Sequence, residues 1–311
     1  MPRLHWHHER PLRVAVVLLG TALLQAAPFA TPLAAQSTRA DVTHAPATSL
    51  ASRAMAVGTV GPRVLAAAAN IVNITTTDYA FDMPATLPAG LTTMRLANKG
   101  KELHHVYLVK VPAGKSSKDI LAWFKAGGPP PAWMKPVGGP NASAGITEFT
   151  STLEAGDYVV FCVIPSPDGA PHVMKGMIKD LKVTPSANRS APPTPTLTLT
   201  LKDYDFTFDK PLTAGKHVIA VKNSGPQPHE FFLAKLMPGK TPMDMARFAE
   251  KPSGAPPGIP FGGITDILPG QTVYLTVDLP AGEYGLICFD PDVKDGRPHL
   301  AHGMIKQLTV R

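Results

Sequence analysis

The sequence contains few cysteines, few charged residues and few aromatic residues. Of its 311 residues, 17% are charged, 7% are aromatic and only two are cysteines, Cys162 and Cys288. The low charge argues against long exposed helices. With 34 prolines and 26 glycines, the composition instead favours a β-rich globular protein with many turns.

Other features are missing as well. The lysines are scattered and form no basic stripe with interleaved aromatic residues, so we expect no nucleic-acid partner. Beyond residue 35, no stretch of 18 or more apolar residues occurs, which argues against a membrane span there. No Ser-His-Asp order, phosphate-binding loop or paired-carboxylate pocket stands out.

Residues 1–35 have the features of a signal peptide. A basic start with Arg3, Arg10 and Arg13 precedes the apolar run VAVVLLGTALLQAA, and small residues near Ala34 offer a cleavage site. We therefore predict export to the periplasm or the extracellular space, with no membrane span after cleavage. The alternative is an uncleaved segment that anchors the chain in the membrane.

The remaining sequence repeats itself at an offset of 125 to 127 residues. Such similarity between units of more than 100 residues indicates two copies of one fold rather than a solenoid. The matched segments are TTTDYAFDMPATLPAG with TLKDYDFTFDKPLTAG, MRLANKGKELHHVYLVKVPAGK with IAVKNSGPQPHEFFLAKLMPGK, and LEAGDYVVFC with LPAGEYGLIC.

This repeat predicts two tandem domains, at 71–186 and 196–311. Residues 36–70 and 187–195 are predicted linkers because they are rich in Ser, Thr, Ala and Pro and lack periodicity. Within each copy, short alternating segments bounded by Gly and Pro predict strands. The predicted fold class is all-β, with two Greek-key β-sandwiches.

Each copy also contains one predicted short helix. In the first copy, Ser116 can cap SKDILAWFKAGG, with Asp119 at the third helical position. In the second copy, Thr241 can cap PMDMARFAEK, with Pro242 first and Asp244 third.

Potential metal ligands recur near the ends of predicted strands in both copies. An Asn-x-Gly-x-x-x-His segment is followed by a Cys that ends an apolar strand, and then by His-x4-Met. Each copy therefore offers two imidazoles, one thiolate and one thioether. The candidate metal ligands are His104, Cys162, His172 and Met177, and His229, Cys288, His299 and Met304.

Two His and one Cys in a trigonal arrangement, with a weak axial Met, form a blue-copper electron-transfer site. We therefore predict one copper ion per domain and interpret the chain as an exported copper-binding protein for single-electron transfer or copper holding. A redox partner protein is possible; the oligomeric state is not predicted.

The two copies resemble cupredoxin domains, the fold of plastocyanin, azurin and the domains of multicopper oxidases. Their loops, C-x9-H-x4-M and C-x10-H-x4-M, are longer than those of the small electron carriers. They are more similar to the long blue-copper loop of copper nitrite reductases. The resemblance covers most of residues 70–311, and only the ligand segments are specific.

The resemblance also bears on enzymatic activity. Nitrite reductases and multicopper oxidases connect the blue copper to a second centre through a His directly beside the Cys, whereas Phe161 and Ile287 occupy that position here. The nearest additional candidate, His105, is matched by Glu230 in the second copy. Because no second set of ligands assembles from the sequence, we expect a protein that is not an enzyme.

Alternatives remain open at this stage. The cysteines could form a disulfide, the default in an exported protein, or be inert buried thiols. The His and Met residues could serve only to pack the loops, which would leave a metal-free binding or structural module of the cell envelope. Met174 and His302 are further candidates for positions close to the metal or exposed on the surface.

Overall fold

The computed structural model describes residues 68–311, which belong to one compact unit. The predicted signal peptide and residues 36–67 of the predicted linker lie outside this part of the chain. Within residues 68–311, no helix is both long and apolar enough to cross a membrane.

The first half of the described chain consists of short strands with one α-helix and one 3-10 helix. Its elements are β1 (Asn70–Thr77), β2 (Ala80–Asp82), β3 (Thr86–Pro88), β4 (Gly90–Asn98), β5 (Tyr107–Val111), α1 (Ser117–Ala126), β6 (Lys135–Gly138), β7 (Ile146–Leu153), β8 (Gly156–Phe161), η1 (His172–Lys175) and β9 (Ile178–Thr184).

The second half follows nearly the same order of elements. They are β10 (Leu197–Lys202), β11 (Asp205–Phe208), β12 (Gly215–Asn223), β13 (His229–Leu236), α2 (Pro242–Glu250), β14 (Gly258–Ile267), β15 (Thr272–Leu279), β16 (Gly282–Ile287), η2 (His299–His302) and β17 (Ile305–Val310).

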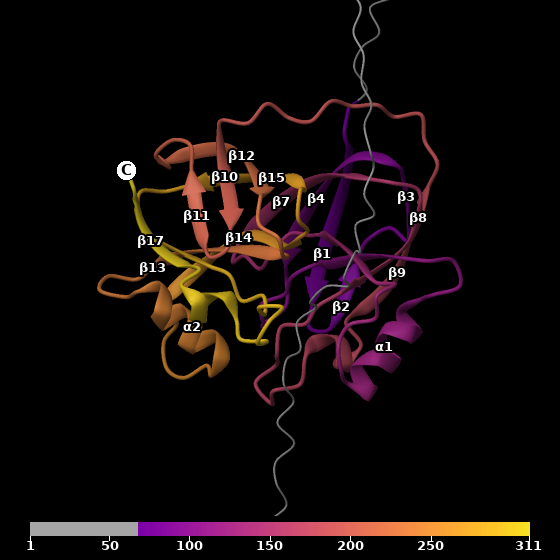
Figure 1. Ribbon diagram of the computed structural model, residues 1–311, viewed down its shortest axis with the longest axis horizontal. Coiled ribbons are helices and arrows are strands. Elements are labelled where there is room, and N and C mark those ends of the chain that lie inside the picture. The colour runs from indigo at the N-terminus through magenta and orange to yellow at the C-terminus, as the bar shows by residue number, and fades with distance from the viewer. Residues whose placement is uncertain (1–67) are drawn as a thin grey trace, which may run out of the picture. The chain divides into compact units, whose positions relative to one another are not determined.

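These strands form three sheets (Figure 1). An eight-stranded sheet has the order β11-β10-β12-β15-β7-β4-β1-β2 and contains strands of both halves. The five-stranded sheet β3-β9-β8-β5-β6 comes from the first half, and the four-stranded sheet β14-β13-β16-β17 comes from the second. The predicted all-β sandwich fold class is therefore confirmed.

The two halves join where β7 pairs with β15. In this antiparallel pair Leu275 lies opposite Phe149, and both side chains are almost completely buried. Contacts between the halves are therefore part of a continuous sheet and core. The division of the chain into two tandem domains, with the boundaries given above, stays a prediction.

Alternation of apolar and polar residues explains the sandwich. In β4, Met94 and Leu96 are buried, whereas Arg95 between them is not. In β10, Leu197, Leu199 and Leu201 are buried in the same alternating way. Since successive side chains of a strand point to opposite faces, each strand places its apolar residues in the core between sheets.

Both predicted helices form at the expected residues. The carboxylate of Asp119 accepts a hydrogen bond from the backbone N–H of Ser116 at 3.0 Å at the start of α1. The Thr241 hydroxyl accepts one from the N–H of Asp244 at 3.2 Å at the start of α2. These contacts satisfy donors that a helix N-terminus leaves without intrahelical partners.

Candidate metal centres

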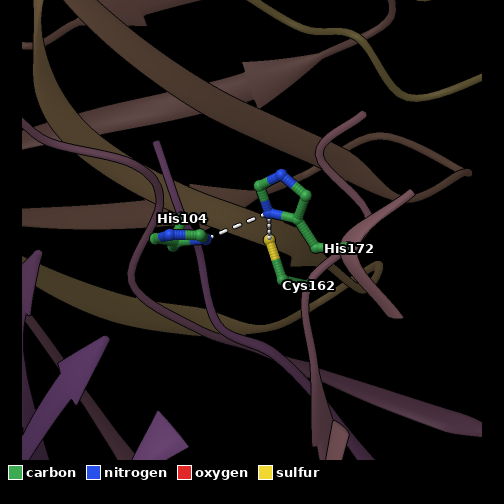
Figure 2. A group of neighbouring side chains, drawn as sticks. All are labelled: His104, Cys162 and His172. Carbon is green, nitrogen blue, oxygen red and sulfur yellow. Dashed lines mark hydrogen bonds between the residues drawn. The ribbon is translucent and has the colours of Figure 1, made fainter. Parts of the chain in front are cut away.

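Three side chains from distant parts of the first half meet in the protein interior (Figure 2). His104 lies in the loop between β4 and β5, Cys162 directly follows β8, and His172 begins η1. The Nδ1 atoms of the two His are 3.0 Å apart, and Cys162 Sγ lies 3.4 Å from His172 Nδ1. All three residues are completely buried.

The second half brings together the matching residues with almost the same geometry. His229 Nδ1 lies 3.0 Å from His299 Nδ1, and Cys288 Sγ lies 3.3 Å from His299 Nδ1. These residues are also completely buried. The repeated motif in the sequence thus corresponds to a repeated three-dimensional group of donor atoms.

The spacing of the donor atoms fits a trigonal metal ion. Ligand atoms at about 2.0–2.3 Å from one ion in a trigonal plane are separated by about 3.5–4 Å. The spacings of 3.0 and 3.4 Å in the first group are slightly shorter, so a small outward movement of the side chains would accommodate the ion. Two imidazoles and one thiolate are the equatorial donors of a blue-copper site, and both His-Cys-His groups fit this type of site.

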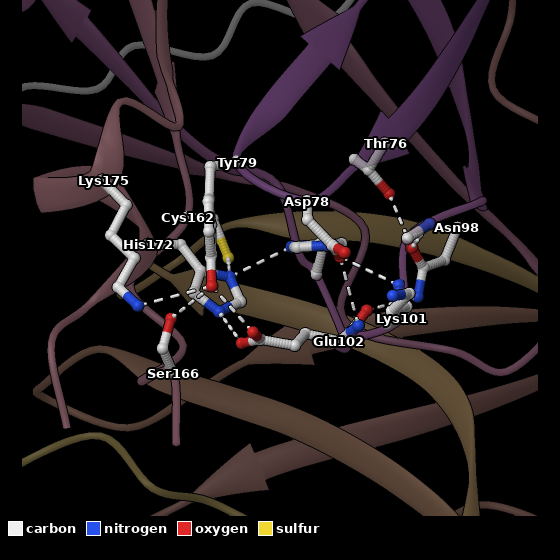
Figure 3. A network of polar contacts seen from close by, with 12 residues as sticks. Thr76, Asp78, Tyr79, Asn98, Lys101, Glu102, Cys162, Ser166, His172 and Lys175 are labelled. Carbon is white, nitrogen blue, oxygen red and sulfur yellow. Dashed lines mark hydrogen bonds and ion pairs between the residues drawn. The ribbon is translucent and has the colours of Figure 1, made fainter. Parts of the chain in front are cut away.

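Carboxylates lie at the outer edges of the imidazole rings (Figure 3). His172 Nε2 lies 2.9 Å from Glu102 Oε2, and His104 Nε2 lies 3.4 Å from Asp78 Oδ1. A carboxylate accepts hydrogen bonds, so it favours the proton on Nε2 and leaves Nδ1 with a free lone pair. Two such lone pairs then face each other across 3.0 Å, an arrangement that a cation between them would stabilise.

The second half repeats only part of this outer arrangement. His229 Nε2 lies 2.7 Å from Asp203 Oδ1, as expected from the first half. Gln227 occupies the sequence position that matches Glu102 and directs its amide to Asp203 and Asp292. His299 Nε2 consequently has no hydrogen-bond partner within residues 68–311.

Burial sets the protonation of the candidate ligands. It lowers the pKa of His104, His172 and His229, and lowers that of His299 to about 4. The imidazoles are therefore neutral near pH 7, which is the form that binds metals. Burial also raises the pKa of the Cys162 thiol to about 12, so metal binding there would release the thiol proton.

Neither cysteine forms a disulfide. Instead, each sulfur accepts a backbone hydrogen bond from the residue after the first His. The N–H of His105 points to Cys162 Sγ at 3.5 Å, and the N–H of Glu230 points to Cys288 Sγ at 3.3 Å. Such donors stabilise negative charge on sulfur, as a thiolate ligand requires.

The long loop between Cys and His folds out and returns. Pro165 pairs with Pro171 at its neck, and the N–H of His172 donates to the Ile164 carbonyl at 3.0 Å. The corresponding neck in the second half is the pair of Pro291 and Pro298. The residues between the two paired prolines form a turn away from the His-Cys-His group. The long interval between Cys and His is therefore compatible with a compact site.

Met177 and Met304 each follow the second His of their group by five residues, and both are completely buried. The Met177 carbonyl accepts a hydrogen bond from Cys162 N–H at 3.2 Å, and its N–H donates to the His172 carbonyl at 3.0 Å. Met304 makes the same backbone contacts with Cys288 and His299. The roles of the two thioethers as axial ligands stay predictions.

The remaining candidates lie outside the His-Cys-His groups. His105 is buried, and its Nε2 accepts a hydrogen bond from Val163 N–H at 3.0 Å. Glu230, at the matching position, accepts one from Phe289 N–H at 2.9 Å. Both side chains therefore hold the backbone that follows the cysteine.

Sequence reasoning did not identify the carboxylates behind the imidazoles. A signal was present, because the dipeptide Asp-Tyr recurs at 78–79 and 203–204 within matched segments. In the first half, Tyr79 donates to Glu102 at 2.7 Å and packs edge-on against His172. Tyr204 packs edge-on against His299 in the second half.

Comparison with known proteins gave no match to a family model and none to a characterised sequence. Among solved structures, auracyanin A, a blue copper protein from Chloroflexus aurantiacus, is 23% identical over 38% of this chain and 100% of its own, with a TM-score of 0.27. Copper nitrite reductase from Thermus scotoductus is 12% identical over 78% of this chain and 61% of its own, with a TM-score of 0.21. A blue copper oxidase from Nitrosomonas europaea is 13% identical over 78% and 86%, with a TM-score of 0.22.

These comparisons correct one expectation. Similar solved structures include copper nitrite reductases and a blue copper oxidase, which are enzymes, and this finding overturns our prediction that the chain is not an enzyme. That prediction depended on two local criteria, a His beside Cys162 or Cys288 and additional His residues near the first His of each copy. Residues beside the cysteine say nothing about ligands contributed by other elements.

Proposed function

We propose that the chain is an exported copper-binding protein that transfers single electrons, with one copper ion in each His-Cys-His group. Bound copper would supply a one-electron redox couple. The observation that carries this proposal is the pair of imidazole Nδ1 atoms facing each other at 3.0 Å beside a buried thiol, found twice. Support for export comes from the features of residues 1–35.

The surroundings suit electron transfer because they are rigid. Cys162 follows a strand in the five-stranded sheet, and η1 is fixed by the Val173 N–H bond to the Cys162 carbonyl at 2.8 Å. Gly176 adopts φ 102°, a left-handed conformation that turns the chain into β9. Packing and outer hydrogen bonds would limit the movement of these side chains between the oxidation states of a bound ion.

Copper titration tests this function. The purified chain should bind two copper ions and develop intense blue absorption that disappears on anaerobic reduction and returns on reoxidation. Reduction of the copper-loaded chain should consume one electron per copper ion. Copper that binds without the blue band, or a band that does not return, would argue against electron transfer through these sites.

Glu102 should strengthen the first site through His172. In a Cys288→Ser background, where only the first site can become blue, Glu102→Ala is expected to weaken copper binding by about 10–100-fold, because it removes the acceptor that orients the imidazole. Competition with a copper chelator measures the affinity. Glu154→Ala, which removes an exposed carboxylate paired with Lys110, is the matched control and should change little. Equal affinities for the two variants would contradict the role of Glu102.

A further inference from the structure

A third group of potential ligands lies in the long loop of the second half and in η2. Ligand atoms of Asp292, Asp295 and His302 all lie within 4.8 Å of one another. Asp292 is buried, whereas the side chains of Asp295 and His302 are 42% and 23% exposed. The group is therefore anchored in the protein and open to solvent on one side.

The matching loop of the first half holds a cation of its own. Asp168 and Lys175 take the positions of Asp295 and His302, and Lys175 Nζ lies 2.8 Å from Asp168 Oδ2. The same ammonium lies 3.4 Å from the Tyr79 hydroxyl, and over its ring at 4.9 Å from the centroid (Figure 3). The first loop thus shows that this part of the fold accommodates a positive charge.

The second half lacks this ammonium and carries two more carboxylates in the loop, one of which, Asp292, belongs to the group of potential ligands. Asp292 takes the place of Ser166, and His302 replaces the lysine.

Burial opposes ionisation of Asp292, but hydrogen bonds from Tyr204 and Gln227 hold its pKa well below the usual value. The backbone N–H of Arg297 lowers the pKa of Asp295. Within residues 68–311, neither carboxylate pairs with a lysine or an arginine, and the ion-pair partner of Asp295 is His302 at 3.2 Å, which carries a charge only when protonated.

A second observation points to the same place. His299 is completely buried and its Nε2 has no partner in the described part of the chain, and Tyr204 packs against both His299 and His302, with ring centroids 5.4 and 5.0 Å apart. The corresponding His172 Nε2 is satisfied by Glu102 at 2.9 Å. An unsatisfied buried nitrogen is costly, and a bound ion with its coordinated water would remove that cost.

We propose that Asp292, Asp295 and His302 bind one divalent transition-metal ion of the zinc class, separate from the two His-Cys-His groups. Two carboxylates and one imidazole are typical ligands of such an ion and leave a coordination position for water. The ion would neutralise the two carboxylates, as Lys175 neutralises Asp168 in the first half.

Equilibrium dialysis of the full chain against zinc at a fixed free concentration tests this site. The chain is first loaded with two equivalents of copper, one for each thiolate site, which copper binds in preference to zinc. Wild type should retain one more zinc per chain than His302→Ala or Asp295→Asn, both at partly exposed positions, with at least a tenfold loss of affinity in each variant. Asp168→Asn, the matched change in the first loop, should retain as much zinc as wild type.

Conversion of the first loop provides an independent test. The double variant Ser166→Asp with Lys175→His should bind one additional zinc, and Asp168→Asn added to it should remove that zinc again. Equal zinc binding by wild type, His302→Ala and Asp295→Asn would overturn the proposal, as would a converted loop that binds no additional zinc. Both comparisons are differences between variants, so their outcome does not depend on whether the His-Cys-His groups bind copper.

Discussion

Replacing both cysteines with serine is expected to abolish the blue absorption of the copper-loaded protein completely. The band requires a thiolate bound to copper, and serine offers no comparable donor. Cys162 and Cys288 are the only cysteines in the chain, so no other thiolate can substitute. Each single variant should lose about half of the absorption, because each His-Cys-His group would contain one copper ion.

The single variants serve as controls for each other. Cys162→Ser leaves the second site unchanged, and its remaining band reports that the protein is folded. Absorption spectra and the copper content of both variants provide the measurement. If the double variant stays blue, or if one single variant loses the whole band while the other loses none, a thiolate in each half is not the source of the colour.

Asp266 should stabilise the copper-free protein at low pH, and this contribution should decrease as the pH rises from about 4 to 8. Burial raises the pKa of this carboxyl to about 8, compared with about 3.9 in an unfolded chain. Between these values the folded state keeps the proton and the unfolded state has released it. The stabilisation is therefore complete below about pH 4 and is lost as the pH rises through about 8.

The geometry explains why Asp266 keeps its proton. It is 2% exposed on β14, its Oδ2 contacts the Tyr107 hydroxyl, and its Oδ1 has no hydrogen-bond partner within residues 68–311. The buried carboxyls of Glu230 and Asp290 lie nearby, and the pKa of Asp290 is raised by burial and by the charges of Asp266 and Glu230. Ionising Asp266 there would place an unpaired charge beside other acidic groups in a low-dielectric interior.

Urea unfolding at several pH values measures this effect. The difference in unfolding free energy between wild type and Asp266→Asn should decrease by up to about 1.4 kcal/mol per pH unit between about pH 4 and 8, the value for one proton. Asp278→Asn, which changes an exposed carboxyl on β15, is the matched control and should follow wild type. If Asp266→Asn and wild type had parallel curves between about pH 5 and 8, the carboxyl would be ionised in the folded state.

The sequence was sufficient to predict the fold class and the members of the His-Cys-His groups. Alternation such as that of β4 predicts strands, and the caps Ser116 and Thr241 predict the two helices, because these signals are local. The grouping of His104, Cys162 and His172 followed from their repetition and from copper chemistry. Spacing alone could not show that the loop between Cys162 and His172 folds back, since pairing at its neck is a tertiary contact.

The repeated Asp-Tyr dipeptide marks Asp78 and Asp203 in the sequence, but it could not show which side chains they contact. Asp78 lies 26 residues from His104, and only the fold brings them together. The joining of both halves through β7 and β15 was also hidden, because strand alternation identifies a strand but not its neighbour. Export and the two domain boundaries stay predictions.

The number and type of copper ions bound by wild type test the central claim most directly. Metal analysis combined with electron paramagnetic resonance should find two copper ions per chain, both with the signature of a thiolate-bound blue centre, and a stoichiometric blue band. A chain that takes up no copper while both thiols titrate as free, or that binds copper without this signature, would contradict the account.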